Sequence, residues 1–425
     1  MLQNAGAACE RDATASERTF LARLAERFGT PLHVLCGDTL RARIDALMRA
    51  MEGMNALACY AVKANGNRAI LARMAAAGLG ADIVSGGELR RALDAGVPAG
   101  RIVFSGVGKT TDEIDAALAA GIARFNVESF DELQLLQHLA VKRRMVAHAS
   151  VRVNPDVDAR THEKISTGRA GDKFGVEFDE ARRWFATSTE RPNVRLDGLH
   201  VHIGSQLLDV APFREAYARV AGLWRELASA GHAIGCIDVG GGLGVPYRTA
   251  GDHAIPACAQ VDAAREAFAG FDGRFVFEPG RWLVAEAGFL LARVVRTKRA
   301  GGRDFVVLDA GMNDLARPSL YDAWHEIETL HGRAGRRIAC DVVGPVCETG
   351  DIFARGRELS ECRADDLVRI RTTGAYGASM ASTYNSRPLA AEVLVEDGRC
   401  ALVRRRQSLE AMVADELQHE EWITP

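Results

Sequence analysis

The sequence predicts a (β/α)8 barrel of the TIM type followed by an antiparallel β domain. From about residue 57, short β-branched apolar runs alternate with amphipathic helical stretches, which is the pattern of parallel βαβ units. After residue 288 the pattern changes to strands joined by tight turns. A length of 425 residues exceeds the size at which one hydrophobic core usually stops growing, so two domains are expected.

Eight apolar runs supply the strands of the predicted barrel. In chain order they are LACYAVK (57–63), ADIVS (81–85), RIVFSG (101–106), RFNVES (124–129), ASVRVNP (149–155), LDGLHVHIGS (196–205), IGCIDVGGG (234–242) and RFVFEPGR (274–281). Eight parallel strands with helices between them close into a barrel.

The helices between these runs carry their own start and stop signals. Capping-box spacing occurs at Ser85/Glu88, Thr110/Glu113 and Ser129/Glu132. Glycines stand just past predicted helix ends at Gly78, Gly96, Gly121 and Gly231. Residues 156–175 form an unusually long connection, and loops of that length usually act in binding.

The second domain is predicted from two hairpins. FLLARVVRTKR and DFVVLDA flank Gly301-Gly302, and AAEVLVE and RCALVRR flank Asp397-Gly398. Before the barrel, a helix near 16–28 and a strand at PLHVLC (31–36) are expected to pair with that β domain. We therefore divide the chain into an N-terminal segment (1–37), a barrel (38–285) and a C-terminal β domain (286–425).

Composition and charge favour an enzyme with a small-molecule partner. With 53 basic and 56 acidic residues the net charge is −3, which lacks the basic footprint of a nucleic-acid binder. Charged residues interrupt the N-terminal segment and the apolar stretch 283–295, so neither a signal peptide nor a membrane span is predicted. Nine scattered cysteines without C-x-x-C spacing fit reduced thiols in the cytoplasm and no metal site.

The active site of such a barrel lies at the carboxyl ends of its strands, where this sequence is unusually polar. The strand-end segments are Lys63, Ser85-Gly86-Gly87-Glu88, Arg152, His202-Ile203-Gly204-Ser205, Gly240-Gly241-Gly242 and Glu278-Pro279-Gly280-Arg281. The loops after strands seven and eight are the usual phosphate site. The glycine triplet and Arg281 suit an anion there, although three glycines alone also fit a simple tight turn.

A phosphate site, a lysine and a carboxylate around one barrel mouth indicate pyridoxal phosphate. The cofactor's aldehyde needs a lysine for a Schiff base, and its ring nitrogen needs an acidic partner. Lys63 and Glu278 fit these roles, and no other lysine is expected at a strand end on this rim. His202 is placed flat on the ring.

Seven motifs resemble the alanine-racemase-like, fold-type-III pyridoxal-phosphate decarboxylases. In the barrel they are YAVKAN (60–65), HVHIGSQ (200–206), DVGGGLG (238–244) and EPGR (278–281), and beyond it DAGMNDLARPSLY (309–321), GPVCETGD (344–351) and GAYGASMASTYNSRP (374–388). The last three resemble the branch that converts meso-2,6-diaminopimelate to L-lysine and carbon dioxide, the last step of lysine biosynthesis. The similarity runs from about residue 20 to the C-terminus.

The resemblance implies a homodimer with shared active sites and a set of residue roles. Cys347 and Glu348 come from the partner's β domain, and Cys347 protonates the substrate carbon. The implied cofactor residues are Lys63, His202, Ser205, Gly240, Gly241, Gly242, Glu278, Gly280, Arg281 and Tyr376. The implied substrate residues are Arg281, Arg317, Tyr321, Glu348 and Tyr376. The loop with THEKISTG (161–168) and KFG (173–175) matches the family's active-site loop.

Charge supports a substrate with a second amino-acid head, which presents both a carboxylate and an ammonium. Arg317 and Glu348 supply one partner for each, although Arg317 also fits a surface arginine and Cys347 a small buried hydrophobe. Relatives acting on ornithine, arginine, a carboxylated polyamine or a siderophore intermediate, and a non-catalytic cofactor carrier, remain alternatives. One departure is Thr372-Thr373, where many relatives have an acidic residue, which affects hydrogen bonding around Tyr376.

Overall fold

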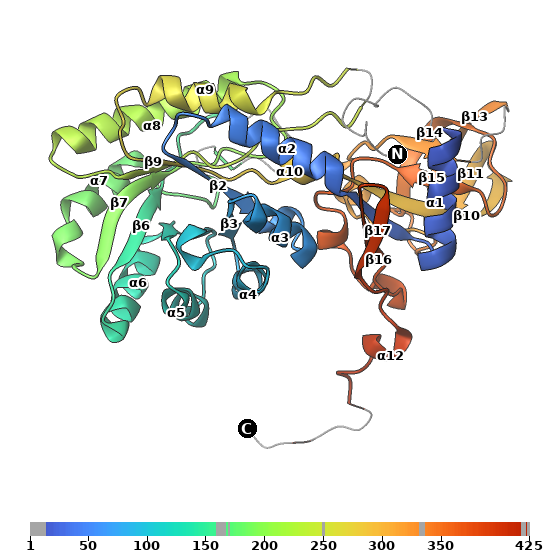
Figure 1. Cartoon of the computed structure of the whole chain (residues 1–425), viewed down its shortest axis with the longest axis horizontal. Coiled ribbons are helices and arrows are strands. Elements are labelled where there is room, and N and C mark those ends of the chain that lie inside the picture. Colours follow the sequence, from blue (N-terminus) through green and yellow to red (C-terminus); the bar gives the residue numbers. More distant parts are fainter. Residues whose placement is uncertain are drawn as a thin grey trace. The chain divides into compact units, whose positions relative to one another are not determined.

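The computed structural model describes residues 14–158, 167–168, 171–248, 251–330, 336–417 and 422. The chain forms two compact units, Thr39–Glu286 and the combination of Met1–Asp38 with Ala287–Pro425. Each unit is built around its own sheet (Figure 1).

The first unit is a closed barrel of eight parallel strands, which confirms the predicted fold class. Its strands pair in chain order and the last closes on the first. They are β2 (Ala56–Ala61), β3 (Gly80–Ile83), β4 (Ile102–Phe104), β5 (Arg124–Val127), β6 (Ala147–Arg152), β7 (Val194–His200), β8 (Cys236–Asp238) and β9 (Arg274–Phe277). Each of the eight predicted runs overlaps one of these strands.

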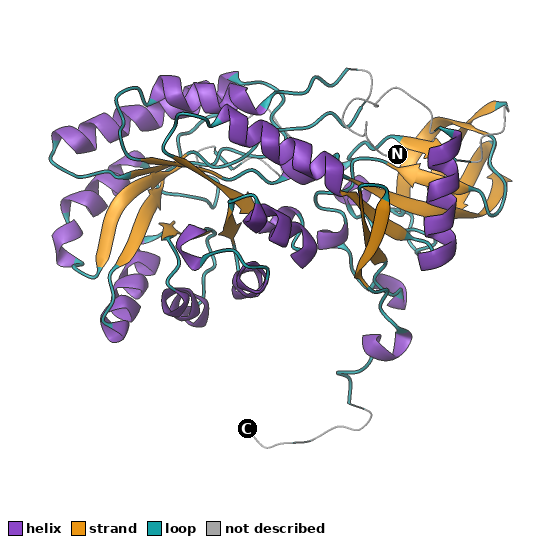
Figure 2. Ribbon diagram, in the orientation of Figure 1, coloured by secondary structure: helices purple, strands orange, loops and turns teal. Residues whose placement is uncertain are grey.

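Helices cover the outside of the barrel strands (Figure 2). They are α2 (Gly37–Ala50), α3 (Arg68–Ala76), α4 (Gly86–Asp94), α5 (Thr111–Ala120), α6 (Phe130–Arg143), α7 (Phe178–Ala186), α8 (Ala211–Ser229), α9 (Ala257–Ala267) and the short α10 (Arg281–Val284). Short 3-10 turns are η1 (Val62–Ala64), η2 (Ala99–Arg101) and η4 (Ser188–Glu190).

The predicted helix caps are present, with one difference. Thr110 and Glu113 form a reciprocal capping box at α5. At α4 and α6 the serine accepts the expected amide, but the glutamate side chain bonds one residue further back, to the N–H of Val84 or Glu128. All four predicted terminal glycines have positive φ, as helix C-termini require.

The interior of the barrel changes from apolar to polar along its axis. Cys59, Val103, Cys236 and Val276 pack together as a buried apolar cluster. Toward the carboxyl ends of the strands the buried side chains are polar: Asp82, Ser105, Asn126, Ser150, Arg152, His200, Asp238 and Glu278. Buried polar groups are costly unless they are paired, so this layer is where a function is expected.

The second unit is a nine-stranded sheet, counted over the described residues, with the path β14-β13-β11-β10-β1-β16-β17 and with β12 and β15 attached through β10. Its strands are β1 (Leu32–Cys36), β10 (Gly288–Ala300), β11 (Arg303–Leu308), β12 (Ile327–Thr329), β13 (Arg337–Val343), β14 (Ile352–Ser360), β15 (Leu367–Ile370), β16 (Ala391–Glu396) and β17 (Arg399–Arg404). The two predicted hairpins are β10–β11 and β16–β17.

The sheet is mostly antiparallel, but β1–β16 and β11–β13 pair in parallel. The strand at 31–36 was expected to pair with this domain, but neither its partner strands nor the parallel β11–β13 pair was predicted. β1, from the N-terminal segment, lies between β10 and β16. The remaining elements are α1 (Ala15–Phe28), α11 (Arg317–Tyr321), α12 (Leu409–Met412) and the 3-10 turns η5 (Ala378–Met380) and η6 (Tyr384–Ser386).

Alternate residues of β10 serve opposite faces of this sheet, as the period of a strand requires. Leu290 and Ala292 pack with residues of β11, β13 and β14, whereas Phe289 and Leu291 pack with α1, β1 and β16. Figure 1 shows α1 running alongside these strands.

Two further predictions concern the described part of the chain. None of its helices is both long and apolar enough to cross a membrane. Its eight cysteines form no disulfide. Most of the loop motif 161–168 lies outside the described residues.

Candidate active site

Lys63 lies in η1, two residues beyond the end of β2, at the carboxyl end of the barrel. Its Nζ donates to Oδ2 of Asp82 at 2.8 Å, and its side chain is 37% exposed whereas that of Asp82 is fully buried. Burial, and then the charge of Glu278, raise the pKa of Asp82 despite the opposing effect of Lys63. The amine is thus held at the rim yet remains accessible.

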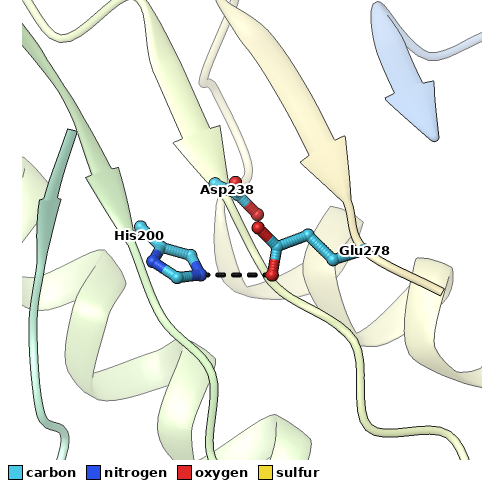
Figure 3. Close-up of side chains that lie close together, drawn as sticks. All are labelled: His200, Asp238 and Glu278. Carbon is cyan, nitrogen blue, oxygen red and sulfur yellow. Dashed lines mark ion pairs between the residues drawn. The ribbon is translucent and has the colours of Figure 1, made fainter. Parts of the chain in front are cut away.

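Glu278 follows β9 and is the centre of the buried polar layer. Its Oε1 accepts from Ser105 Oγ at 3.2 Å and from Asn126 Nδ2 at 3.3 Å, and its Oε2 lies 3.3 Å from His200 Nε2. Figure 3 shows the His200 ring directed at this carboxylate and the Asp238 carboxylate facing it from β8. Each Glu278 oxygen therefore has a nitrogen or hydroxyl neighbour.

Glu278 and Asp238 have pKa values that are displaced in opposite directions. Burial opposes ionisation of Glu278, but His200 and Lys63 outweigh it and hold the pKa of Glu278 well below its usual range. Burial, and then the charge of Glu278, raise the pKa of Asp238 well above its usual range. Two facing carboxylates cannot both ionise cheaply in a buried site, so the charge of Glu278 opposes ionisation of Asp238.

His202, which follows β7, is held by the glycine triplet. Its Nδ1 accepts the N–H of Gly241 at 3.2 Å, so a neutral ring carries its proton on Nε2. Burial, followed by the charges of Arg152 and Lys63, lowers the pKa of His202 to about 3. The imidazole is therefore neutral at physiological pH.

The triplet Gly240–Gly242 after β8 leaves no space for side chains. A Cβ on Gly241 would lie 2.1 Å from the carbonyl oxygen of Glu278, and one on Gly240 would lie 2.4 Å from that of Val201. The N–H of Gly240 donates to Asp238 Oδ1, and that of Gly241 to His202. Two amides of the triplet thus bind within the protein, which differs from a cradle in which all three face an anion.

Arg281 and Ser205 lie together beside the triplet. Nε and Nη2 of Arg281 lie 3.3 and 3.0 Å from Ser205 Oγ, and Nη1 donates to the Tyr247 hydroxyl at 2.7 Å. Gly280 precedes Arg281, and a Cβ there would lie 3.1 Å from Cβ of Ala61. A buried guanidinium is thus fixed next to a hydroxyl, a combination that suits phosphate.

The remaining predicted site residues lie in the second unit. Arg317 begins α11 and is buried, with Nη1 2.8 Å from His325 Nε2. Tyr321 ends the same helix and is half-buried. Tyr376 is half-buried with a positive φ of 57°. Thr372 also has positive φ, 59°, and the neighbouring Thr373 has a buried hydroxyl without a hydrogen-bond partner.

Cys347 and Glu348 are exposed in the turn between β13 and β14. The Cys347 N–H donates to Asn385 Oδ1 at 2.9 Å. A hydrogen bond to Glu348 raises the pKa of Tyr384. Asp351 closes the turn, because its two oxygens accept the N–H groups of Met312 and Val346 at 2.6 and 2.7 Å.

Comparison with known proteins identifies the family. Residues 38–285 match the family model "Pyridoxal-dependent decarboxylase, pyridoxal binding domain". A diaminopimelate decarboxylase of Zymomonas mobilis is 47% identical over 406 residues, covering 95% of this chain and 96% of that protein. The chain belongs to the pyridoxal-dependent decarboxylases.

Solved structures give the same result for nearly the whole chain. The diaminopimelate decarboxylase of Helicobacter pylori complexed with L-lysine superposes with a TM-score of 0.89 at 41% identity, covering 92% of this chain and 98% of that one. The lysine/ornithine decarboxylase of Vibrio vulnificus complexed with putrescine gives 0.80 at 26% identity, with coverages of 90% and 99%.

The barrel fits the pyridoxal phosphate of this decarboxylase family on three observations. Glu278 is a buried, ionised carboxylate, the partner that a protonated pyridine nitrogen needs. Lys63 supplies an accessible amine at the same rim. The buried Arg281 guanidinium is fixed against the Ser205 hydroxyl, a charged and a neutral donor that together suit a phosphate.

Sequence reasoning missed several residues of this site: Asp82, Ser105, Asn126, His200, Asp238 and Tyr247. Asp82 lies within β3 and Asp238 ends β8. A single aspartate in an otherwise apolar strand was the feature of the sequence that could have indicated them. Lys109, in the loop after β4, is a second lysine on this side of the barrel. It donates to Glu132 and to the carbonyls of Gly106 and Asn126 and is fully buried, so its amine is already occupied.

His200, Asp238 and Glu278 also have the spacing of metal ligands, with one candidate atom of each within 4.8 Å of the others. Their hydrogen bonds favour a different use. Asp238 accepts from Gly240 and Asn126, and Glu278 accepts from Ser105 and Asn126. The cluster is already a bonded network that supports the carboxylate of Glu278.

Proposed function

We propose that the protein decarboxylates meso-2,6-diaminopimelate to L-lysine and carbon dioxide. The observation that carries the proposal is its similarity over more than nine-tenths of the chain to diaminopimelate decarboxylases, at 47% identity for the Zymomonas mobilis enzyme. The lysine/ornithine decarboxylase of Vibrio vulnificus is 26% identical. Lysine formation would complete lysine biosynthesis.

Lys63 and Glu278 hold the reactive part of the cofactor. Pyridoxal phosphate, when bound, accepts the electron pair left on the substrate's Cα as carbon dioxide departs. Lys63 would hold the cofactor through its amine, which is accessible at the barrel rim beside Asp82. Glu278 keeps the ring nitrogen protonated, because its own charge is stabilised by His200, Ser105 and Asn126.

The phosphate is held by Arg281, Ser205, Gly280 and the triplet Gly240–Gly242. The fixed guanidinium of Arg281 supplies charge, while the glycines permit close approach of the backbone. His202 would contact the cofactor ring. Because its imidazole is neutral, His202 would add no positive charge beside the ring. Glu278 is then the residue that favours protonation of the ring nitrogen.

The second amino-acid head of the substrate binds to Arg281 of the barrel unit and to residues of the β unit. Arg317 and Arg281 hold its carboxylate, Glu348 holds its ammonium, and Tyr321 and Tyr376 line the same region. Cys347 gives the proton that replaces the lost carboxylate on Cα. A diamine-forming enzyme needs an acid at this end but no arginine for a distal carboxylate.

The protein acts as a homodimer with two shared sites, each taking Cys347 and Glu348 from the partner's β domain. Their exposure in the single chain supports this arrangement. A C2 pair would bury the same surface on both copies. A cytoplasmic location suits the scattered thiols, which form no disulfide among the described residues.

The decisive experiment is carbon dioxide release from purified protein supplied with cofactor. The panel is meso-diaminopimelate, ornithine, arginine, L-lysine, a carboxylated polyamine and a siderophore intermediate, with chiral analysis of the product. L-Lysine as product from diaminopimelate is expected. Preference for ornithine would reject the proposal and favour the activity of the Vibrio vulnificus enzyme. Bound cofactor without turnover of any substrate would indicate a non-catalytic cofactor carrier.

A further inference from the structure

Arg317 has a buried histidine partner outside every motif considered above. His325 lies in the segment between α11 and β12 and is completely buried. Its Nε2 is 2.8 Å from Nη1 of Arg317, and its Nδ1 is 2.8 Å from the carbonyl oxygen of Arg371. The imidazole therefore bridges a guanidinium and a backbone carbonyl.

The two partners determine where the imidazole carries its proton. A carbonyl oxygen can only accept, so Nδ1 must be protonated to contact Arg371. A guanidinium can only donate, so Nε2 must offer its lone pair to Arg317. His325 is thus neutral and in one tautomer, and an imidazolium would present an N–H and a positive charge to Arg317.

The position of His325 is fixed by its surroundings. The β12–β15 ladder pairs Ile327 with Ile370 and is continued by the bond from Arg371 N–H to the Glu326 carbonyl. The His325 carbonyl accepts Nη1 of Arg357 at 2.8 Å, and the Arg357 guanidinium lies 3.5 Å from the centre of the Trp324 ring. Backbone and ring are both anchored, so the Nε2 lone pair points in a defined direction.

We infer that His325 is a positioning residue, which orients the Arg317 guanidinium for the distal carboxylate of the substrate. This inference rests on the proposed function, in which Arg317 binds that carboxylate. An arginine side chain has several rotatable bonds, and its forked donors match a carboxylate only in one plane. A fixed acceptor at one corner of the guanidinium selects that plane before the substrate arrives.

The product provides a test of the distal end alone. In L-lysine the amine at the end of the side chain marks the carbon that lost carbon dioxide, so its α-carboxylate is the distal group. Cadaverine is the same molecule without that carboxylate. The ratio of the inhibition constants of cadaverine and L-lysine on the holoenzyme therefore measures recognition by Arg317.

Two substitutions separate positioning from packing. In His325→Asn the amide nitrogen takes the place of Nδ1 and keeps the bond to the carbonyl of Arg371, but the shorter side chain does not reach Arg317. In His325→Gln the longer side chain places an amide oxygen where Nε2 stood and keeps an acceptor for Arg317. Both replace the ring with an amide, so packing losses are similar.

We expect His325→Asn to raise the inhibition constant of L-lysine about tenfold, while that of cadaverine changes less than about twofold. KM for diaminopimelate should rise similarly with little change in kcat. His325→Gln should keep the selectivity within about threefold, and in an Arg317→Ala background His325→Asn should cause no further loss. Equal weakening of both inhibitors, or equal effects of Asn and Gln, would reject the positioning role.

Neutron diffraction from wild-type crystals tests the same inference without relying on a variant that folds. A hydrogen on Nδ1 and none on Nε2 is expected, and a hydrogen on Nε2 would overturn it. Failure of the wild type to decarboxylate diaminopimelate would instead reject the proposed function. Wild-type activity with unchanged selectivity in His325→Asn rejects the inference alone.

Discussion

Glu278 and Asp238 are chemically alike and face each other, yet the structure displaces their pKa values in opposite directions. His200, Ser105 and Asn126 surround Glu278, whereas Asp238 meets the negative charge of Glu278. The difference arises from neighbours on other strands, since both side chains are fully buried. We therefore expect an amide to be tolerated better at Asp238 than at Glu278.

We expect Glu278→Gln to lower kcat about a hundredfold or more, because a neutral amide cannot keep the ring nitrogen protonated. Cofactor affinity should change little, since the phosphate contacts of Arg281 remain. The matched variant is Asp238→Asn, whose amide oxygen can still accept the Gly240 N–H and whose NH2 can face the Asn126 amide, whose Oδ1 has no hydrogen-bond partner. It should keep kcat at least about tenfold higher than Glu278→Gln, because ionisation of Asp238 is already opposed by Glu278. Steady-state kinetics would measure kcat, and cofactor titration would measure the affinity. Similar kcat values for the two variants would contradict the different electrostatic roles of the two carboxyl groups.

Lys63 is the expected attachment point because its amine is accessible, in contrast to the buried Lys109. Borohydride treatment of the holoenzyme followed by peptide mass mapping should find the cofactor on Lys63, with the Lys109 peptide unmodified. Lys63→Ala should abolish the adduct and reduce turnover to background. A stable adduct on another lysine in that variant would show that the site is assigned to the wrong residue.

The barrel residues predicted from sequence share one property, which is that each begins the loop after a strand. Lys63, His202 and Glu278 could be placed on one rim because parallel strands end on the same side. Asp82 and Asn126 could not, because they lie within β3 and β5, and Asp238 ends β8 shortly before the more conspicuous glycine triplet. His325 was missed because the β12–β15 pairing alone brings its partner Arg371 close to it.

At the scale of elements, the starts of α4 and α5 contain two glutamates with opposite electrostatic behaviour. Glu88 accepts the Val84 N–H at 2.8 Å, and burial raises its pKa from 4.5 to about 7. Glu113 accepts the N–H groups of Gly86 and Thr110, which lower its pKa. Both cap a helix start, but only Glu88 is deprived of water.

The raised pKa of Glu88 predicts that ionising this carboxyl lowers the free energy of unfolding. Between about 4.5 and 7 the folded protein binds this proton more tightly than the unfolded chain, so the contribution to stability falls as pH rises through that window. Glu88→Gln keeps an acceptor for Val84 and removes the charge. Its melting temperature should therefore match wild type at pH 5 and exceed it by a few degrees, about 2–4 °C, at pH 8.

Glu113→Gln is the control of opposite sign. Its lowered pKa means that the ionised form stabilises the fold above about pH 4.5, and that this stability is lost on acidification. Thermal denaturation of the holoenzyme should give this variant a melting temperature below that of the wild type at pH 8. At pH 4 the two melting temperatures should lie closer together. A Glu88→Gln curve parallel to wild type at every pH would show that Glu88 titrates normally.

The turn carrying Cys347 and Glu348 depends on one buried carboxylate. Asp351 accepts two backbone amides that Asn cannot both satisfy, since its NH2 would face an N–H. We expect Asp351→Asn to lower kcat about tenfold or more by misplacing the turn, with cofactor binding by the barrel unchanged. Asp341→Asn is the matched control, because Asp341 accepts the Gly356 amide between the same strands, away from the turn. Equal losses in both would indicate general damage to the sheet.

On the scale of the whole chain, the sheet of the second unit is formed by segments from both ends of the sequence. β1 pairs with β10 and β16, although the complete barrel lies between β1 and β10 in sequence. Local patterns predicted β1, β10 and β16 as strands. A hairpin signal pairs only strands that are neighbours in sequence, so it could not identify these long-range partners. The proposed site residues are likewise divided, with Lys63 in the barrel unit and Cys347 in the sheet unit.

This division makes the shared-site dimer testable by mixing inactive subunits. If each site combines Lys63 of one subunit with Cys347 of the other, a Lys63→Ala/Cys347→Ala heterodimer has one site with both lesions and one with neither. The matched control mixes Lys63→Ala with Glu278→Gln, two lesions in the same unit. Each site of that heterodimer keeps one lesion, so no recovery is expected.

With equal amounts and random exchange, half of the dimers are mixed and half of their sites are intact. Activity should therefore recover to roughly one quarter of wild type for the Lys63/Cys347 pair. Exchange is verified by differently tagged subunits co-purifying, and activity is measured as carbon dioxide released from meso-diaminopimelate. If each site were built within one chain, every site in the mixture would contain a lesion and activity would stay at background. Demonstrated exchange without recovery would thus reject the shared site, and a fully active Cys347→Ala homodimer would remove Cys347 from the reaction.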